Sequence, residues 1–225
     1  MVVLTAEEIQ RIDRLTTEKF YIPSYTLMEN AGKGIADYIT SDRELSKLAA
    51  AAVVICGTGR NAGDGFVVAR YLFIKGKAVK VVKFNPDAAY TGDTAQNLKI
   101  LRALNKVPIF DISPSTMEDI KRIVHSADLL IDAIFGIGIN KRVEGIFKDV
   151  IMEMNNSKKC VVSVDIPSGL HPDTGEPMGI AVAASHTLTV GFMKKGFLSA
   201  EAKKYTGKIY VIDIGYPPLE LLEIN

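Results

Sequence analysis

The strongest constraint on the fold is an alternation of short apolar runs with segments of helical periodicity, which begins at residue 51. The apolar runs predict strands at residues 51–56, 77–84, near Pro108, 127–135 and 160–167. The segments between them predict helices at residues 64–74, 94–103, 117–125 and 144–154. Strands that are apolar along their whole length are typical of parallel sheets with helices on both faces. We therefore expect a three-layer α/β/α, Rossmann-like sandwich with a mostly parallel sheet.

The N-terminal residues 1–50 predict helices that pack on this core. Thr5 and Glu8 have the spacing of a capping box, which predicts a helix that continues to about Glu18. Pro23 then precedes a second amphipathic segment with apolar residues at helical spacing.

The C-terminal part contains two further apolar runs, at residues 186–192 and 207–215. Because no strong helical pattern lies between them, we expect the far edge of the sheet to be partly antiparallel. The sequence contains no repeat, low-complexity stretch or linker, so it predicts one domain over residues 1–225.

Composition excludes several classes of partner. Lysine and arginine number 27 and aspartate and glutamate 26, and this balance gives no reason to expect binding to nucleic acid or to an anionic membrane. No apolar run is long enough to span a bilayer, and the first residues lack the pattern of a signal peptide. Cys56 and Cys160 predict buried, reduced thiols in adjacent strands, which indicates a cytoplasmic protein.

Three polar loops each follow a predicted strand, at residues 57–65, 132–145 and 165–177. In parallel sheets, ligands bind at the carboxyl ends of the strands, where such loops meet. Pro167 and Gly169 indicate a tight turn in the third loop that presents Asp165 and Ser168. We therefore expect the candidate site along this edge of the sheet.

The first loop has the glycine spacing G-x-G-x-x-x-G, which is weak evidence for dinucleotide binding. The second strand ends in Lys83-Phe84-Asn85-Pro86, whereas dehydrogenases carry a ribose-binding acid there. Asp64 lies near the predicted helix start, where it either caps the helix or meets a ligand approached by both amides and oxygens.

Asn61, Asp132 and Ser168 place three different oxygens on the three loops. Oxygen ligands with one formal charge favour a hard cation of low charge over a transition metal. Asp132 has a structural alternative, in which it caps the next backbone turn. The histidines show no metal spacing and are expected at the surface or in loops: His125, His171 and His186.

Five stretches in order resemble one family: LMENAG, NAGDGFVVAR, DAIFG, VVSVDIPSGL and TVGFMKKG. Together they are similar to the NAD(P)H-hydrate epimerases, the YjeF N-terminal domain family, from about residue 27 to residue 215. The resemblance implies an isomerase that interconverts the R and S epimers of hydrated NADH or NADPH, called NADHX and NADPHX.

The resemblance also implies roles for particular residues. Asn61, Asp132 and Ser168 match the ligands of a potassium ion, one per subunit. The substrate-binding positions fall on Arg60, Asn61, Ala62, Gly63, Asp64, Gly136, Ile137, Gly138, Ile139, Asn140, Lys141, Arg142 and Asp165. Asp165 is expected to exchange the proton of the reacting hydroxyl, and Lys194 to orient Asp165 or to bind phosphate.

Four positions depart from the family pattern: Arg60, Ala62, His171 and Ser185. They affect the expected fit of the substrate more than the catalytic groups. One alternative function is a non-catalytic nucleotide-binding or scaffold module of the same fold, which the intact Asp165 and cation ligands disfavour. A Rossmann dehydrogenase or methyltransferase is disfavoured by the missing acid after the second strand.

The resemblance finally implies partners. We expect a homodimer formed through the apolar first helices, and a functional partnership with an ATP- or ADP-dependent NAD(P)H-hydrate dehydratase. We expect no dehydratase domain within residues 1–225.

Overall fold

A computed structural model describes residues 2–222. Its centre is a seven-stranded sheet in which every neighbouring pair is parallel. The spatial order is β4 (Ile109–Asp111), β3 (Ala78–Lys83), β2 (Ala51–Cys56), β5 (Leu129–Ala133), β6 (Cys160–Val164), β7 (His186–Val190) and β9 (Lys208–Ile212). The strand order reverses between β2 and β5, which confirms the predicted α/β class and its parallel core.

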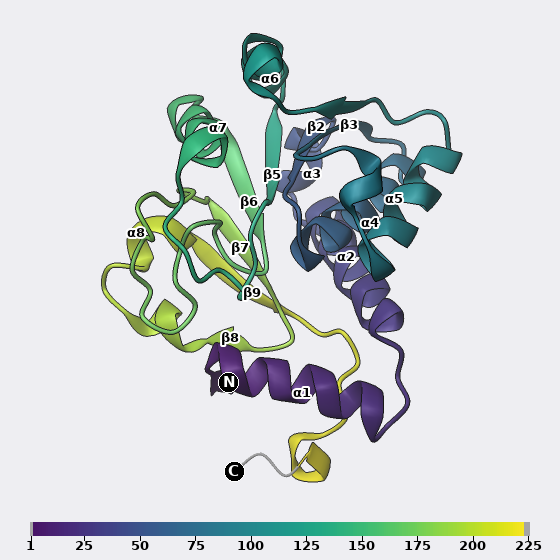
Figure 1. Ribbon diagram of the computed structural model, residues 1–225, viewed down its shortest axis with the longest axis vertical. Helices are drawn as coiled ribbons and strands as arrows, with labels where there is room; N and C mark the ends of the chain where they lie inside the picture. Colours follow the sequence, from purple (N-terminus) through teal and green to yellow (C-terminus); the bar gives the residue numbers. More distant parts are fainter. Residues whose placement is uncertain (1, 223–225) are drawn as a thin grey trace.

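Helices cover both faces of the sheet (Figure 1). One face packs against α2 (Ser24–Ser41), α4 (Arg60–Ile74) and α5 (Gly92–Ala103), with the short α3 (Leu45–Leu48) beside α2. The other face packs against α6 (Met117–His125) and α7 (Gly145–Asn156). No helix within residues 2–222 is long and apolar enough to cross a membrane.

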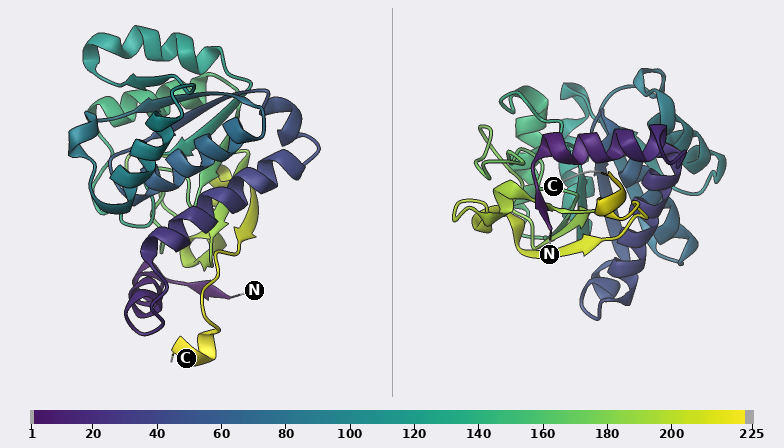
Figure 2. Two further views of the ribbon diagram at one scale, coloured as in Figure 1. Left: turned by 90° about the vertical axis from the view of Figure 1, so that its right-hand side faces the viewer. Right: turned by 90° about the horizontal axis from the view of Figure 1, so that it is seen from below.

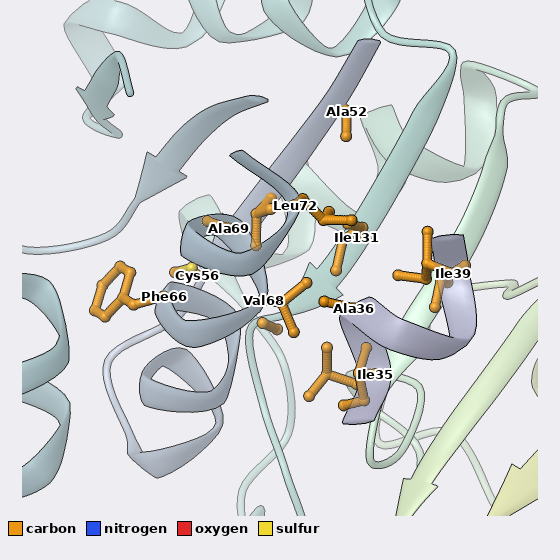
Figure 3. Packing of buried hydrophobic residues seen from close by; sticks show 14 of the residues in the cluster. Ile35, Ala36, Ile39, Ala52, Cys56, Phe66, Val68, Ala69, Leu72 and Ile131 are labelled. Carbon is orange, nitrogen blue, oxygen red and sulfur yellow. The ribbon is translucent and has the colours of Figure 1, made fainter. Parts of the chain in front are cut away.

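The tightest helix contact in this core joins α2 and α4. Ile35, Ala36 and Ile39 of α2 lie against the side of α4 that carries Val68, and both helices close over β2 and β5 (Figure 3). A Cβ on Gly32 would lie 2.4 Å from the Cβ of Val67, so the absence of a side chain at residue 32 sets how closely the helices approach. The second predicted helix therefore packs on the core as expected.

The predicted antiparallel edge is wrong, because β9 runs parallel to β7, with His186 opposite Lys208. Parallel neighbours need a crossover connection. Residues 191–207 provide it with β8 (Met193–Lys194), η3 (Lys195–Leu198) and α8 (Lys203–Thr206). These elements are too short to give a helical pattern in the sequence.

The first predicted helix does not pack on a face of the sheet but lies across the carboxyl ends of the strands. The capping box is confirmed, because the Glu8 backbone N–H donates to the Thr5 hydroxyl at 3.3 Å and the Thr5 N–H to Glu8 Oε2 at 2.7 Å. α1 (Ala6–Glu18) follows β1 (Val3–Leu4), which pairs with β8 in a separate two-stranded sheet. Figure 2 shows β1 and η4 (Leu219–Leu222) at this same end of the molecule.

Two predictions about buried residues need correction. Cys56 is buried and Cys160 is partly buried, but β5 separates their strands. His186 lies in β7 and is only 5 % exposed, because its ring stacks near Tyr210 with the centroids 6.3 Å apart. His125 ends α6, and His171 lies in the loop after β6, as expected.

Candidate functional site

A cavity of about 730 Å³ lies between α1 and the carboxyl ends of the strands. Its walls include the start of α4, the loop after β5, Asp165 after β6 and Lys194 in β8. The predicted meeting of the strand-end loops at one edge is therefore confirmed. A volume of this size is typical of small-molecule sites.

The glycine turn after β2 allows the first wall to form. Gly57 donates its N–H to the carbonyl of Ala133 at 3.0 Å, and a Cβ on Gly57 would lie only 1.9 Å from the carbonyl oxygen of Ile134. Gly59 is the N-cap of α4 and has no side chain to cap the first turn. Uncapped N–H groups at a helix start can bind the polar or anionic part of a ligand.

α4 starts at Arg60, four residues earlier than predicted, so Asp64 lies inside the helix and does not cap it. Arg60, Asn61 and Asp64 line the cavity. Ala62 and Gly63 do not, because both are buried, and a Cβ on Gly63 would lie 2.5 Å from the sulfur of Met28. Of the predicted first-loop ligand residues, the structure brings three to the cavity.

The second wall consists of the loop after β5. All seven predicted residues of this loop line the cavity: Gly136, Ile137, Gly138, Ile139, Asn140, Lys141 and Arg142. Ile137 also packs with α1 and the C-terminal segment. The loop therefore connects the sheet edge to the α1 wall.

Asp132 and Ser168 lie behind the cavity wall that Asn61 and Phe135 line. Asp132 is fully buried, and its carboxylate accepts bonds from Ser168 Oγ at 2.5 Å, Ser168 N at 2.8 Å and Ser163 Oγ at 2.8 Å. The carbonyl oxygen of Phe135 accepts from Asn61 Nδ2 at 3.0 Å, and the Phe135 N–H donates to Ser168 Oγ at 2.8 Å. The side chains of the three predicted cation ligands are thus linked through the Phe135 backbone.

Burial raises the pKa of Asp132, and the hydrogen bonds from Ser168 and Ser163 oppose that shift. Within residues 2–222, no lysine, arginine or histidine nitrogen lies within ion-pair distance of its carboxylate. The amide of Ile134 also donates to Asp132, at 3.3 Å. The predicted capping of the next turn is therefore present alongside the hydrogen bonds from Ser168 and Ser163.

Asp165 and Lys194 form an ion pair on the wall of the cavity. Oδ1 of Asp165 accepts from the Lys194 ammonium and from the Val190 N–H, the latter at 3.0 Å. Lys194 is 1 % exposed and also donates to the carbonyls of Val190 at 2.9 Å and Phe192 at 3.2 Å. An ammonium has three N–H donors, so this geometry engages all of them and leaves none for a phosphate.

Asp165 has a left-handed backbone conformation, with φ at 69°, which is uncommon for a residue with a side chain. No donor within the described part of the chain reaches its second carboxylate oxygen, Oδ2. Strained backbone of this kind often marks functional positions. The loop therefore holds one oxygen of Asp165 on Lys194 and leaves the other for a ligand.

Two other carboxyls that line the cavity, Asp64 and Asp13, have raised pKa values. Burial raises the pKa of Asp64 well above its usual range, and the charge of Asp165 adds to the shift. Burial also raises the pKa of Asp13 in α1, against a hydrogen bond from Tyr216 and the charge of Arg60. Groups with such shifts can hold a proton nearer neutral pH than an ordinary carboxyl.

Sequence reasoning missed the contributions of the two chain ends. Ile9, Gln10 and Asp13 of α1 line the cavity, as does Tyr216 after β9. The capping box predicted the helix, but no local pattern showed that it faces the sheet edge. Ser185, one of the four positions that differ from the family pattern, directly precedes β7 at the amino end of that strand. This is the opposite edge of the sheet from the cavity. Its hydroxyl accepts a hydrogen bond from the Val161 N–H at 3.3 Å.

Comparisons with known proteins identify the family of the chain. A family model described as YjeF-related protein N-terminus matches residues 24–196. The NAD(P)H-hydrate epimerase of Lentilactobacillus buchneri is 38% identical over 218 residues, which are 94% of each chain. The bifunctional NAD(P)H-hydrate repair enzyme of Thermofilum pendens is 37% identical over 96% of this chain. The chain spans only 41% of that relative's length.

A crystal structure of the yeast protein ynu0 has the same fold, with a TM-score of 0.77 over 94% of this chain and 88% of the yeast chain. Its sequence identity is 22%, so this likeness concerns the fold alone. The family model and the epimerase of Lentilactobacillus buchneri both cover most of the sequence. The chain therefore belongs to the family of YjeF-related protein N-termini.

Proposed function

We propose that the chain is an NAD(P)H-hydrate epimerase that interconverts the R and S epimers of NADHX and NADPHX. The names of its relatives support this activity. The observation that carries the proposal is Asp165, which lies on a wall of the cavity with one oxygen on Lys194 and the other without a protein donor. The uncapped helix start and the loop at residues 136–142 supply the surface for a dinucleotide.

The chemistry follows from the hydrated ring. Its carbon 6 carries a hydroxyl and is bonded to the ring nitrogen, whose lone pair can expel the hydroxyl as water and leave an iminium cation. Water then adds to the opposite face. A carboxylate on the cavity wall stabilises that cation and exchanges protons with the water, and such acid–base catalysis contributes ~10²–10⁴-fold. In this proposal Asp165 is the catalytic residue and Lys194 positions it.

We also propose one potassium ion per subunit, bound by Asn61, Asp132 and Ser168. The donor set fits, because it combines a single carboxylate with neutral oxygens, including the carbonyl of Phe135. To bind the ion, the Asn61 amide would present Oδ1 in place of Nδ2, which donates to the carbonyl of Phe135 in the structure. When bound, the ion supplies the positive charge that buried Asp132 lacks and ties together the loops after β2, β5 and β6.

Further proposals concern the context of the protein. We propose a homodimer, a cytoplasmic location, and a dehydratase that consumes one of the two epimers. The apolar faces of α1 and α2 are turned inward, so a contact through the first helices would use exposed neighbours such as Tyr21 and Leu221. Analytical ultracentrifugation of the parent and of Tyr21→Ser tests the dimer.

The activity is tested by mixing R and S hydrates with a dehydratase specific for one epimer. With the protein present, the reaction should run to completion faster than spontaneous epimerisation allows. Without an active epimerase, it should slow at the half-way point. A protein that leaves this background unchanged would contradict the enzyme proposal and favour the non-catalytic binding module.

A further inference from the structure

Asp13 and Tyr216 meet at the cavity, although both lie outside residues 24–196, which the family model matches. The hydroxyl of Tyr216 donates a hydrogen bond to Oδ1 of Asp13. Both residues line the cavity that also contains Asp165. α1 crosses beyond the carboxyl edge of the sheet (Figure 1), so Asp13 and Asp165 come from two different walls.

The α1 wall is firmly attached. β1 pairs with β8, which places Leu4 beside Lys194, the partner of Asp165. The backbone N–H of Ala6 donates to Asp173 Oδ1 at 2.7 Å. The apolar side of α1 packs in one buried cluster with Leu4 and Leu222. Asp13 is therefore held in place on a fixed helix rather than on a mobile arm.

Tyr216 is fixed as well. The Asn30 amide donates to the carbonyl of Ile214 at 2.9 Å, just before the tyrosine. The Tyr216 ring stacks on Phe192 with the centroids 5.4 Å apart, and a Cβ on Gly191 would lie 2.4 Å from it. Burial raises the pKa of the Tyr216 hydroxyl, so it stays protonated and donates to Asp13.

Asp13 resembles Asp165 in one respect. Oδ1 accepts the Tyr216 bond, but no donor within residues 2–222 reaches its other carboxyl oxygen. It differs in its charged neighbours, because no ammonium or guanidinium of the described residues forms an ion pair with it, whereas Lys194 pairs with Asp165. The charges that act on Asp13 from the surrounding elements are those of Arg60, Asp64, Asp165 and Lys194.

Epimerisation requires proton exchange on both faces of the ring, since the hydroxyl leaves from one face and water adds to the other. A single carboxyl on one wall contacts one face. We infer that Asp13 is a second proton-exchanging residue, which acts on the face of the ring turned toward α1 while Asp165 acts on the face turned toward the sheet. This inference rests on the proposed epimerase function.

The protons and electrons balance in this scheme. The acid form of Asp13 gives its proton to the departing hydroxyl, the C–O pair leaves with the oxygen as water, and the nitrogen lone pair forms the C=N bond. Water then uses an oxygen lone pair to form the new C–O bond, and the C=N pair returns to nitrogen. Asp165 takes a proton from that water. The opposite direction runs with the two carboxyls in exchanged roles, so no oxidant or other reactant is needed.

The test is Asp13→Asn in oxygen-18-labelled water, with chromatography to separate the NADHX epimers and mass spectrometry to detect the label. We expect the epimerisation rate to fall at least ~10²-fold, the low end for losing an acid–base group. Exchange of the hydroxyl without inversion should continue above background in only one epimer, whose hydroxyl faces Asp165. Glu18→Gln removes an exposed carboxylate from the same helix and should behave as the parent.

Several outcomes would overturn the inference. One is that Asp13→Asn epimerises as fast as Glu18→Gln. Another is that Asp13→Asn folds but loses both epimerisation and label exchange, to the same extent in the two epimers. If Asp13→Asn does not fold, Asp13→Glu keeps the acid but displaces it, and an unchanged rate there would also contradict the role. A parent protein no faster than background would instead refute the proposed function.

Discussion

Two groups of charged side chains lie at the carboxyl edge of the same sheet, and they differ in how their carboxylates are neutralised. The first, the ionic cluster, consists of Lys83, Asp87, Arg102 and Asp111. Lys83 Nζ lies 2.9 Å from Asp87 Oδ1 and 2.5 Å from Asp111 Oδ1, and Arg102 Nη2 lies 2.9 Å from Asp87 Oδ1. The Arg102 guanidinium, helped by Lys83, lowers the pKa of Asp87 to about 2.

The second group, the cavity carboxyls, consists of Asp13, Asp64 and Asp165. Of these only Asp165 has a cation in direct contact within the described residues, and burial raises the pKa of the other two. In the ionic cluster both oxygens of Asp87 lie on cations, so this carboxylate stays charged and serves structure. In the cavity, Asp13 and Asp64 contact no cation within the described residues, and Asp165 keeps one oxygen without a donor, so these carboxyls can exchange a proton with a ligand. The difference separates a structural cluster from a reactive one along a single edge.

The largest effect should come from breaking the buried ion pair, since Lys194→Met leaves Asp165 without its cation. The Lys194 side chain is 1 % exposed and that of Asp165 13 %. Loss of one partner of a buried pair costs about 3–5 kcal/mol in the free energy of unfolding. Urea denaturation followed by circular dichroism measures it.

Lys83→Met is the matched control from the ionic cluster. Lys83 is as buried as Lys194, but the side chains of its partners Asp87 and Asp111 are 43% and 61% exposed, so water can solvate them once the ammonium is gone. The loss of stability should therefore be smaller than for Lys194→Met. Equal losses would show that the two groups are neutralised in the same way and would remove the distinction.

The next effect is on the reaction. Asp165→Asn keeps the shape of the side chain and removes its charge and proton exchange, so epimerisation should slow at least ~10²-fold while dinucleotide binding persists. The dehydratase-coupled assay measures the rate, and calorimetry with NADH measures the binding. Asp87→Asn, from the ionic cluster, should leave the rate unchanged. A fully active Asp165→Asn would move the catalytic role to another cavity residue.

The sequence predicts the sheet and the strand-end loops well because buried strands and amphipathic helices leave local patterns. It predicts the far edge wrongly because the crossover before β9 contains elements of only four residues or fewer. It places the start of α4 too late because glycines at residues 57–65 look like a loop, although residues 60–65 are helical. The short crossover elements and the glycine-rich helix start therefore lack the local pattern from which a helix is predicted.

The residues of the candidate site also divide into those that the sequence predicts and those that it does not. Asp132 lies near the carboxyl end of β5, and Asp165 and Ser168 follow β6, so topology alone predicts that they meet. Asp13 and Tyr216 are 203 residues apart, and although Tyr216 follows β9, Asp13 lies inside α1 and follows no strand of the main sheet. Asp13 stands beside Ile12 in an amphipathic helix, where a carboxylate ordinarily faces water. Only the position of α1 across the sheet edge shows that this carboxylate lines a cavity.

Asp132 belongs to neither group, and its carboxylate accepts hydrogen bonds from the uncharged donors Ser163 and Ser168. It therefore adds a third way of stabilising a carboxylate to the comparison. If potassium balances its charge, replacing sodium by potassium should raise the melting temperature. An ion present at ten to a hundred times its dissociation constant stabilises the folded state by about 1.4–2.7 kcal/mol. Differential scanning calorimetry in matched salts measures this shift. Asp132→Asn should abolish the difference between the salts, whereas Asp87→Asn should retain it.

The smallest effect concerns the pH dependence of the ionic cluster. The pKa of Asp87 is about 2 in the folded protein, below its unfolded value of about 4. The ionised form is thus favoured by folding, so its contribution is fully present above about pH 4 and is lost as the pH falls through about 2. Because the Asp87 side chain is 43% exposed, solvent screening limits that contribution to about 0.2–1 kcal/mol. Asp87→Asn should therefore be slightly less stable than the parent near neutral pH, and the gap in urea midpoints should narrow as the pH falls below about 4. A gap that widens in acid would mean that Asp87, like Asp13 and Asp64, is protonated more easily in the folded protein than in the unfolded chain.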